Sequence, residues 1–186
     1  PNLFFWNKNK MKIAFFGTSN RSEPILEILH KNFDLKLCVT KTDRIVGRER
    51  KKSETKVKSW AKKHGIEIFE IYNMKSSETA LLTELINYGI DMIVVADFGF
   101  IIGKEIIEKF KDNIINIHFS LLPKYRGANP VHAAILNGDT KTGITFTQMV
   151  YELDAGDIIS QFPVPLKGNE TSGELYSMLF TIASQK

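Results

Sequence analysis

Short apolar runs alternate along much of the chain with segments in which apolar residues recur every three or four positions. The runs are typical of strands buried on both faces of a sheet, and they lie at 12–17, 35–40, 67–71, 91–96 and 113–118. The helically spaced segments predict helices opening at Ser22 and running over 53–64, 77–88 and 104–110. This alternation predicts an α/β domain with a doubly wound, Rossmann-like, mostly parallel sheet.

The pattern changes beyond a short helix that is predicted to begin at Pro130. Two further strands are predicted at 143–149 and 157–165, joined by a turn that contains Asp154, and a helix over 171–183. No linker or repeat interrupts residues 11–186, so we expect one domain there. Residues 1–10 precede a Met that resembles a native start, and we expect them to be an N-terminal arm or a non-native remnant.

Composition suits a soluble protein with a hydrophobic core, since 43% of the 186 residues are hydrophobic and 25% are charged. No apolar run approaches the roughly 18–20 residues that span a membrane, and residues 1–10 lack the features of a signal peptide. The single cysteine, Cys38, lies in an apolar run and suits a buried thiol in a reducing compartment. We therefore expect a cytoplasmic protein without a membrane partner.

Basic residues gather between positions 44 and 63, although the net charge of the chain is only +4. The ordinary interpretation of this segment is a solvated loop and helix face, and charge alone favours it. The alternative is a contact with the phosphates of a polyanion, which would weaken as the salt concentration rises.

The carboxyl ends of the predicted parallel strands define where a ligand should bind, because open α/β sheets bind ligands beyond those ends. This rule brings separate segments to one edge of the sheet: 17–19, 40–48, 97–99 and 116–127.

Several common chemistries lack their sequence patterns. The first strand is followed by a single glycine, Gly17, rather than a dinucleotide fingerprint. There is no P-loop, and Ser120 does not lie in a nucleophile elbow. The four histidines have no zinc-ligand spacing, so we expect no metal in the chemistry.

Asn116, His118 and Asp154 form the remaining candidate site. Residues two apart on a strand face the same way, so Asn116 and His118 share one face, and Asp154 on a later turn could fold back onto them. Taken one at a time, each has an ordinary structural interpretation. Asn116 would be an amide at a strand end, His118 a core histidine and Asp154 a turn residue. Together they supply an oxyanion donor, a proton acceptor and an orienting anion, which is what transfer of an acyl group to an amine needs.

The segment that follows His118 has its own backbone signals. Leu122-Pro123 is a candidate for a cis peptide bond, and Gly127 permits a positive φ or a close approach to a ligand.

Two motifs resemble those of the folate-dependent formyltransferases. They are Asn-Ile-His-Phe-Ser-Leu-Leu-Pro-Lys-Tyr-Arg-Gly-Ala at 116–128 and Leu-Asp-Ala-Gly-Asp-Ile at 153–158. Phe16-Gly17-Thr18, the basic loop from Thr42 to Lys58, and the segment from Gly143 to Met149 resemble the branch that formylates methionyl-tRNA. The resemblance covers nearly everything from Met11 onward. Because that branch carries a further C-terminal domain, it implies that this chain corresponds to the catalytic domain.

The resemblance implies transfer of a formyl group from 10-formyltetrahydrofolate to methionyl-initiator tRNA in translation initiation, by a monomer that needs no metal. Asn116, His118 and Asp154 would be catalytic. Folate would be bound by Phe98, Gly99, Phe100, Ile101, Leu153 and Asp157. The tRNA substrate would be bound by Arg44, Arg48, Lys51, Lys52, Ser120, Leu121, Leu122, Pro123 and Arg126. In the family the basic loop contacts the acceptor end of the tRNA. The resemblance therefore favours a tRNA contact over a merely solvated surface for residues 44–52.

Asp97 is a smaller departure from the family pattern. Asp97 lies where the family usually has a small or apolar residue, and it would contact the pterin or cap the following turn.

Two alternatives remain open from the sequence. One is a formyltransferase that acts on an amino sugar nucleotide or another small amine, and the other is a non-catalytic folate- or RNA-binding domain.

Overall fold

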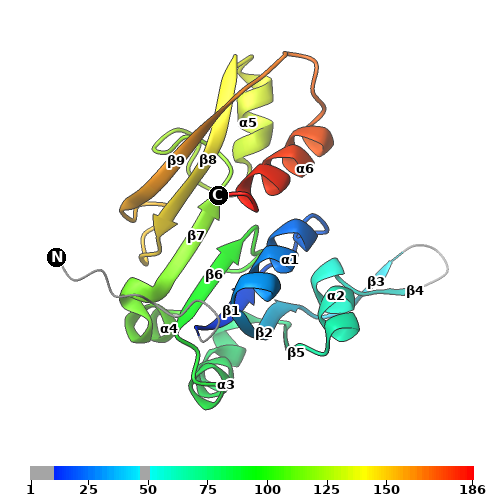
Figure 1. Ribbon diagram of the computed structural model, residues 1–186, viewed down its shortest axis with the longest axis vertical. Coiled ribbons are helices and arrows are strands. Elements are labelled where there is room, and N and C mark those ends of the chain that lie inside the picture. The colour runs from blue at the N-terminus through cyan, green and yellow to red at the C-terminus, as the bar shows by residue number, and fades with distance from the viewer. Residues whose placement is uncertain (1–10, 47–50) are drawn as a thin grey trace.

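A mixed sheet forms the centre of the computed structural model, which describes residues 11–46 and 51–186 (Figure 1). Its strands lie in the order β5-β2-β1-β6-β7-β8-β9. They are β1 (Lys12–Phe16), β2 (Asp34–Lys41), β5 (Glu67–Ile71), β6 (Met92–Ala96), β7 (Ile114–His118), β8 (Lys141–Gln148) and β9 (Ile158–Pro165). The strands from β5 to β7 are parallel, whereas β8 and β9 pair antiparallel. The predicted doubly wound, mostly parallel sheet is confirmed.

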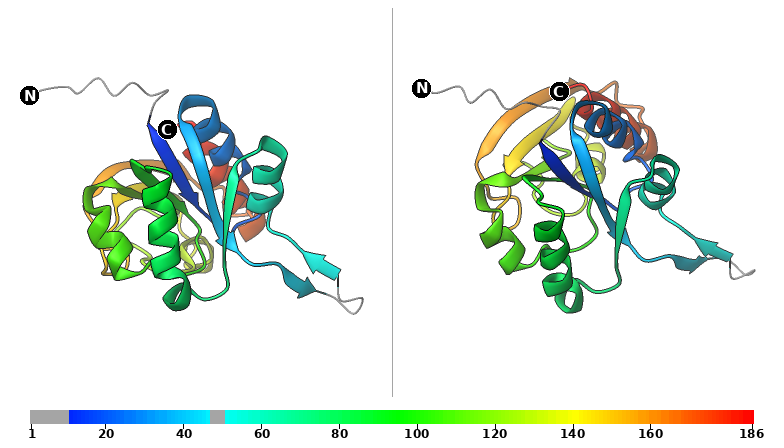
Figure 2. Two further views of the ribbon diagram at one scale, coloured as in Figure 1. Left: turned by 90° about the horizontal axis from the view of Figure 1, so that it is seen from below. Right: turned by 60° about the horizontal axis from the view of Figure 1, so that its bottom comes forward.

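Helices cover both faces of this sheet (Figures 1 and 2). One face carries α1 (Glu23–Asn32), α2 (Lys56–His64), α5 (Pro130–Leu136) and α6 (Ser172–Ala183), and the other carries α3 (Met74–Asn87) and α4 (Lys104–Lys109). A 3-10 turn, η2 (Lys111–Asn113), leads into β7. Adjacent residues of β1 supply both cores, because Phe15 packs with the first group of helices and Phe16 with the second. No helix among these has the length and apolar character that crossing a membrane requires.

Most predicted elements are present, with boundaries that local capping explains. The helix predicted over 53–64 begins at Lys56, because the Thr55 hydroxyl accepts a hydrogen bond from the Lys58 amide. The helix predicted from Ser77 begins three residues earlier, where Asn73 accepts from the Ser76 amide. Thr171 and Glu174 form a complete capping box at the start of α6.

The basic loop that begins at Thr42 differs from expectation, because it contains a two-stranded hairpin. Its strands, β3 (Arg44–Val46) and β4 (Lys51–Ser53), pair antiparallel beyond the carboxyl end of β2. Neither strand has an apolar alternation that would have predicted it. In Figure 1 the hairpin projects away from the sheet beyond α2.

The predicted core thiol is also confirmed. Cys38 is fully buried in β2, and its burial raises the pKa of the thiol to about 12, so it stays protonated.

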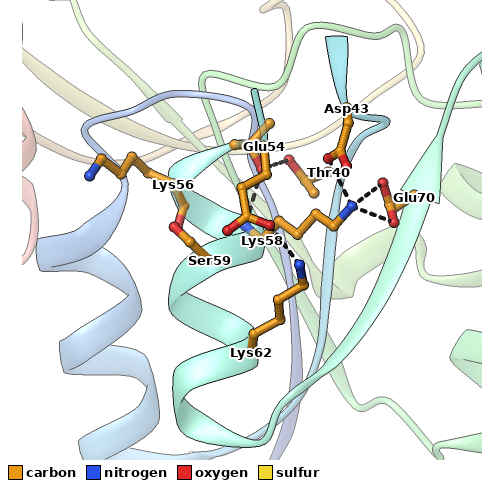
Figure 3. A network of polar contacts seen from close by, with 9 residues as sticks. Thr40, Asp43, Glu54, Lys56, Lys58, Ser59, Lys62 and Glu70 are labelled. Atoms are coloured by element: carbon orange, nitrogen blue, oxygen red, sulfur yellow. Dashed lines mark hydrogen bonds and ion pairs between the residues drawn. The ribbon is translucent and has the colours of Figure 1, made fainter. Parts of the chain in front are cut away.

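A charged cluster joins the base of the hairpin to α2 and β5 (Figure 3). The Lys58 ammonium lies 2.7 Å from an Asp43 oxygen and 2.9 Å from Glu70, and its side chain is only 10% exposed. The hydrogen bond to Asp43 raises the pKa of Lys58, and burial partly opposes that rise. Below the ordinary lysine pKa the cluster therefore contributes its full stability, which is lost only as pH rises through the higher folded-state pKa.

Replacing this ammonium should destabilise the fold. We expect Lys58→Met to lower the free energy of unfolding by about 1–2 kcal/mol at pH 7, because it leaves two neighbouring carboxylates without the cation between them. Urea denaturation measures the change. Lys62→Met is the matched control, since Lys62 is 54% exposed beside Glu54 and such pairs contribute roughly 0–1 kcal/mol. Equal effects of the two substitutions would contradict a structural role for the Lys58 cluster.

Candidate active site

A cavity of about 470 Å³ opens at the carboxyl ends of β6 and β7. The turn between β8 and β9 forms one wall, and the start of α5 and Tyr176 of α6 form another. The volume lies within the range of roughly 300–1,000 Å³ that is usual for small-molecule sites. The cavity thus lies at the edge where the topology rule predicted a ligand site.

Asn116, His118 and Asp154 all line this cavity, and Asp154 contacts the other two. Asn116 Nδ2 donates to Asp154 Oδ1 at 3.2 Å, and His118 Nδ1 lies 3.5 Å from Asp154 Oδ2. The side chains of His118 and Asp154 are only 6% and 10% exposed. The predicted grouping of an amide, an imidazole and a carboxylate is therefore present in the structure.

Asp154 also holds the loop that follows β7. The Gly127 amide donates to Asp154 Oδ2 at 2.8 Å. Gly127 has a φ of 101° and Asp154 a φ of 47°, so both residues joined by this hydrogen bond have positive φ angles. Glycine adopts that conformation at little cost and aspartate more readily than most residues.

The second ring nitrogen of His118 faces the same loop. His118 Nε2 lies 2.9 Å from the Tyr125 carbonyl, which can only accept, so Nε2 carries a hydrogen. Nδ1 is then the nitrogen that can gain or lose a proton, and it faces the Asp154 carboxylate. An imidazolium would donate to both neighbours at once.

The loop from Leu121 to Gly127 is fixed at several points besides Asp154. The peptide bond Leu122-Pro123 is cis, as the sequence allowed. Thr145 Oγ1 donates to the Ser120 carbonyl at 2.6 Å and accepts from the Leu122 amide. Asp139 accepts from Lys124 and from the Tyr125 hydroxyl, and the hydrogen bond from Lys124 lowers the pKa of this carboxyl. These contacts hold the Tyr125 carbonyl against His118.

Most of the predicted folate contacts border the cavity. Phe98, Gly99, Phe100, Ile101 and Leu153 line it, whereas Asp157 is not among its lining residues. Sequence reasoning missed Tyr176, which has no motif around it, and the wall residues Ile102, Ile107 and Met149. Met149 lies in a segment whose sequence resembles the family, so that resemblance could have indicated its place in the site.

The predicted tRNA contacts are spread over three environments. The backbones of Arg44, Lys51 and Lys52 lie in the β3–β4 hairpin, and Arg48 lies outside the described residues. Ser120 and Leu122 are buried, and Leu121 borders a smaller cavity of about 170 Å³. Pro123 and Arg126 are exposed. The side chains of Ser120 and Leu122 are thus placed to support the loop rather than to meet a large substrate.

No group of three or more histidine, cysteine, aspartate or glutamate side chains is placed to hold a metal ion in residues 11–46 and 51–186.

Comparison with known sequences identifies relatives over nearly the whole chain. Residues 11–185 match the family model described as Formyl transferase. The chain is 41% identical over 168 residues to a methionyl-tRNA formyltransferase of Macrococcus caseolyticus, covering 90% of this chain and 54% of that protein. Its counterpart in Bacillus cytotoxicus is 42% identical over 170 residues, covering 91% and 54%. The chain therefore spans about half the length of the relatives it matches.

Solved structures share the fold at low sequence identity. A phosphoribosylglycinamide formyltransferase from Bacillus halodurans has a TM-score of 0.78 at 22% identity, covering 95% of this chain and 90% of that one. A formyltetrahydrofolate deformylase from Pseudomonas syringae has a TM-score of 0.75 at 19% identity, covering 95% and 60%. These similarities support the formyltransferase type of fold.

The contact between Asp154 and Gly127 should be visible in amide exchange. We expect Asp154→Gly, which suits the left-handed backbone, to accelerate hydrogen exchange at the Gly127 amide because its acceptor is lost. NMR-detected exchange measures the effect. Asp157→Ala, three positions further along the same turn, should leave Gly127 unchanged. An unchanged Gly127 rate in Asp154→Gly would contradict the role of Asp154 in holding this loop.

Proposed function

Because the chain belongs to the formyl transferase family, we propose that it transfers a formyl group from 10-formyltetrahydrofolate to the amino group of methionyl-initiator tRNA. Relatives about 40% identical to it are named methionyl-tRNA formyltransferase, and they support this acceptor. The chain spans about half of their length, so it would supply the catalytic part of that activity.

The observation that carries the proposal is the Asp154 carboxylate bridging Asn116 and His118 at one end of the cavity. Asn116 Nδ2 has two hydrogens, and Asp154 takes only one of them. The other is available for the oxygen of a substrate carbonyl. A polar group that is held in place before the substrate arrives stabilises developing charge without reorganising.

The remainder of the cavity suits the donor. Phe98, Phe100 and Met149 give it an apolar wall, and they pack against the core on the α3–α4 side of the sheet. Phe98 lies 5.3 Å from Phe16 and 5.4 Å from Phe100, measured between ring centroids, so the aromatic wall is itself well packed. A flat heteroaromatic ring is the kind of ligand that such a wall accommodates.

The reaction exchanges one C–N bond for another. The bond between the formyl carbon and N10 of the folate breaks, and a bond between that carbon and the acceptor nitrogen forms. The attacking amine loses a proton, and N10 gains one. Negative charge develops on the formyl oxygen in the tetrahedral transition state, where we assign Asn116 as the hydrogen-bond donor.

His118 would handle the proton of the amine. Its Nε2 hydrogen is engaged by the Tyr125 carbonyl, so Nδ1 is the atom that would receive the proton. Asp154 would then stabilise the resulting imidazolium through the contact already present. The burial of both groups strengthens that interaction, because water screens it little.

The acceptor would approach from the side of the hairpin. The β3–β4 strands carry Arg44, Lys51 and Lys52, and their connection carries Arg48. We assign this basic segment to the phosphates of the tRNA acceptor end, as the family resemblance implies.

Incubation of the chain with 10-formyltetrahydrofolate and methionyl-initiator tRNA tests the proposal directly, with formylmethionine measured after hydrolysis of the ester. Product would support both the donor and the acceptor. Transfer to a small amino sugar nucleotide but not to the tRNA would instead favour the alternative acceptor class. Folate binding without transfer to any amine would contradict catalysis by this chain.

Substitutions in the trio should abolish transfer without unfolding the protein. We expect Asn116→Ala to lower the rate of transfer about 10²–10³-fold, because one oxyanion donor is lost. His118→Ala should lower it about 10²–10⁴-fold. Single-turnover transfer measures both. His64→Ala, a histidine stacked on Trp60 away from the cavity, is the control and should keep the rate. Near-native transfer by either trio variant would remove that residue from the mechanism.

We expect substitutions in the basic hairpin to weaken the binding of tRNA and to leave the binding of folate unchanged. We expect Arg48→Ala to raise the KM for tRNA and to reduce its dependence on salt by about one phosphate contact, with folate binding unchanged. Titrations at several salt concentrations measure this. Lys31→Ala, an exposed cation at the end of α1, is the control. An unchanged KM and salt slope for Arg48→Ala would contradict the assignment.

A further inference from the structure

Asp97 places an exposed carboxylate in the same cavity as His118. It directly follows β6, and the register that pairs Ala96 with Ile117 brings Asp97 level with His118 on the neighbouring strand. Among the described residues, no hydrogen bond or ion pair engages its side-chain oxygens. A carboxylate in this position is therefore available to a ligand.

The backbone of Asp97 is firmly held, although its side chain is free. Its φ of 47° lies in the left-handed region, which costs energy for a residue with a side chain. Thr18 compensates from the β1–α1 loop, since its amide and its hydroxyl both donate to the Asp97 carbonyl, at 3.1 and 3.0 Å. The Thr18 hydroxyl also accepts from the Gly99 amide at 3.0 Å. This clamp lies between β1 and β6, where the strand order reverses, and it holds the backbone that carries the carboxylate.

The surroundings of Asp97 differ from those of the aromatic wall. Tyr176 of α6 borders the cavity on this side, and the Arg21 guanidinium lies 5.4 Å from the centre of its ring. Burial raises the pKa of Tyr176, the negative charge of Asp97 adds to the rise, and Arg21 opposes it. These residues belong to the face of the sheet that carries α1, α2 and α6, whereas Phe98 and Phe100 pack toward α3 and α4.

The cavity therefore has two unlike sides that meet at His118. The aromatic side suits the flat ring of the formyl donor. The side with Asp97 is bordered by Tyr176, which lies beside the Arg21 guanidinium. The basic hairpin directly precedes α2 in the chain. An acceptor that is bound by the hairpin would reach His118 from this side, and the cationic group that it would bring to the reaction is its α-ammonium.

We propose that Asp97 binds the α-ammonium group of the incoming aminoacyl acceptor and positions its nitrogen beside His118. The inference rests on the proposed function, because it needs an amine acceptor, and it deepens that function by assigning the ammonium subsite. Asp97 pairs with the cation before transfer. One proton leaves the ammonium for solvent to give the nucleophilic amine. The second passes to His118 during transfer, and N10 of the folate takes up one proton as its bond to the formyl carbon breaks.

Two acceptors that differ only in the charged group test this assignment. One is initiator tRNA carrying methionine, and the other is the same tRNA esterified with the α-hydroxy analogue of methionine. Their dissociation constants are compared at pH 6.5, where an α-amino group is mostly protonated. We expect the wild-type protein to bind the amino form about 10- to 100-fold more tightly, as a hydrogen bond between charged groups allows.

Asp97→Asn should remove this preference while leaving the affinity for the hydroxy analogue unchanged. Asparagine tolerates the same left-handed backbone, so the fold is retained. Glu152→Gln provides the comparison, because it removes a carboxylate from the opposite wall of the cavity, in the β8–β9 turn. It should keep the preference for the amino form. If Asp97 had only a structural role, Asp97→Asn would lower the affinity for both acceptors equally.

Three results would overturn the proposal. The preference could survive in Asp97→Asn, it could disappear in Glu152→Gln instead, or Asp97→Asn could weaken binding of tetrahydrofolate, which would place Asp97 on the pterin. The wild-type transfer assay separates these outcomes from failure of the function itself. Product formation together with any of these results refutes the Asp97 assignment alone, whereas no transfer to methionyl-tRNA refutes the proposed function and the subsite with it.

Discussion

The site depends on one carboxylate that is shared by two side chains of β7 and by a backbone amide of the loop that follows it. Asp154 accepts from Asn116 and from the Gly127 amide and lies beside His118. Asn116 and His118 come from β7, Gly127 from the loop beyond it, and Asp154 from the turn between β8 and β9. Without that anion, the imidazole and the amide would lose the partner they share, and the turn would lose its hydrogen bond to the loop that follows β7.

The sheet makes this convergence possible. In β8, Thr147 pairs with Asn116 and Thr145 with His118, so the antiparallel pair β8–β9 carries its turn back to the end of β7. Gly156 permits the tight return, because a side chain there would collide with the Gln148 carbonyl. Parallel strands on the other side bring Asp97 and the aromatic wall to the same edge. The cavity is thus bounded by parallel strand ends on one side and by an antiparallel turn on the other.

Much of this could be predicted from the sequence, for physical reasons that differ between elements. Buried strands such as β6 have a continuous apolar signal, and Asn116 and His118 share a face because strands alternate. The β3–β4 hairpin had no such signal, since each of its strands has only three residues and neither shows an apolar alternation. Tyr176 was missed because its place in the cavity follows from how α6 packs on Phe119, not from its neighbours in the chain. The second partner of His118, the Tyr125 carbonyl, depends on a left-handed backbone at Tyr125 that its residue type does not indicate.

A crystal structure of the protein with a formyl-bearing folate analogue that cannot release its formyl group would test the central claim most directly. The account predicts that the formyl oxygen lies about 2.7–3.1 Å from Asn116 Nδ2, with the ring of the analogue against Phe98 and Phe100 and His118 beside the formyl carbon. An analogue bound with its formyl group turned away from Asn116 and His118, or bound outside this cavity, would contradict it.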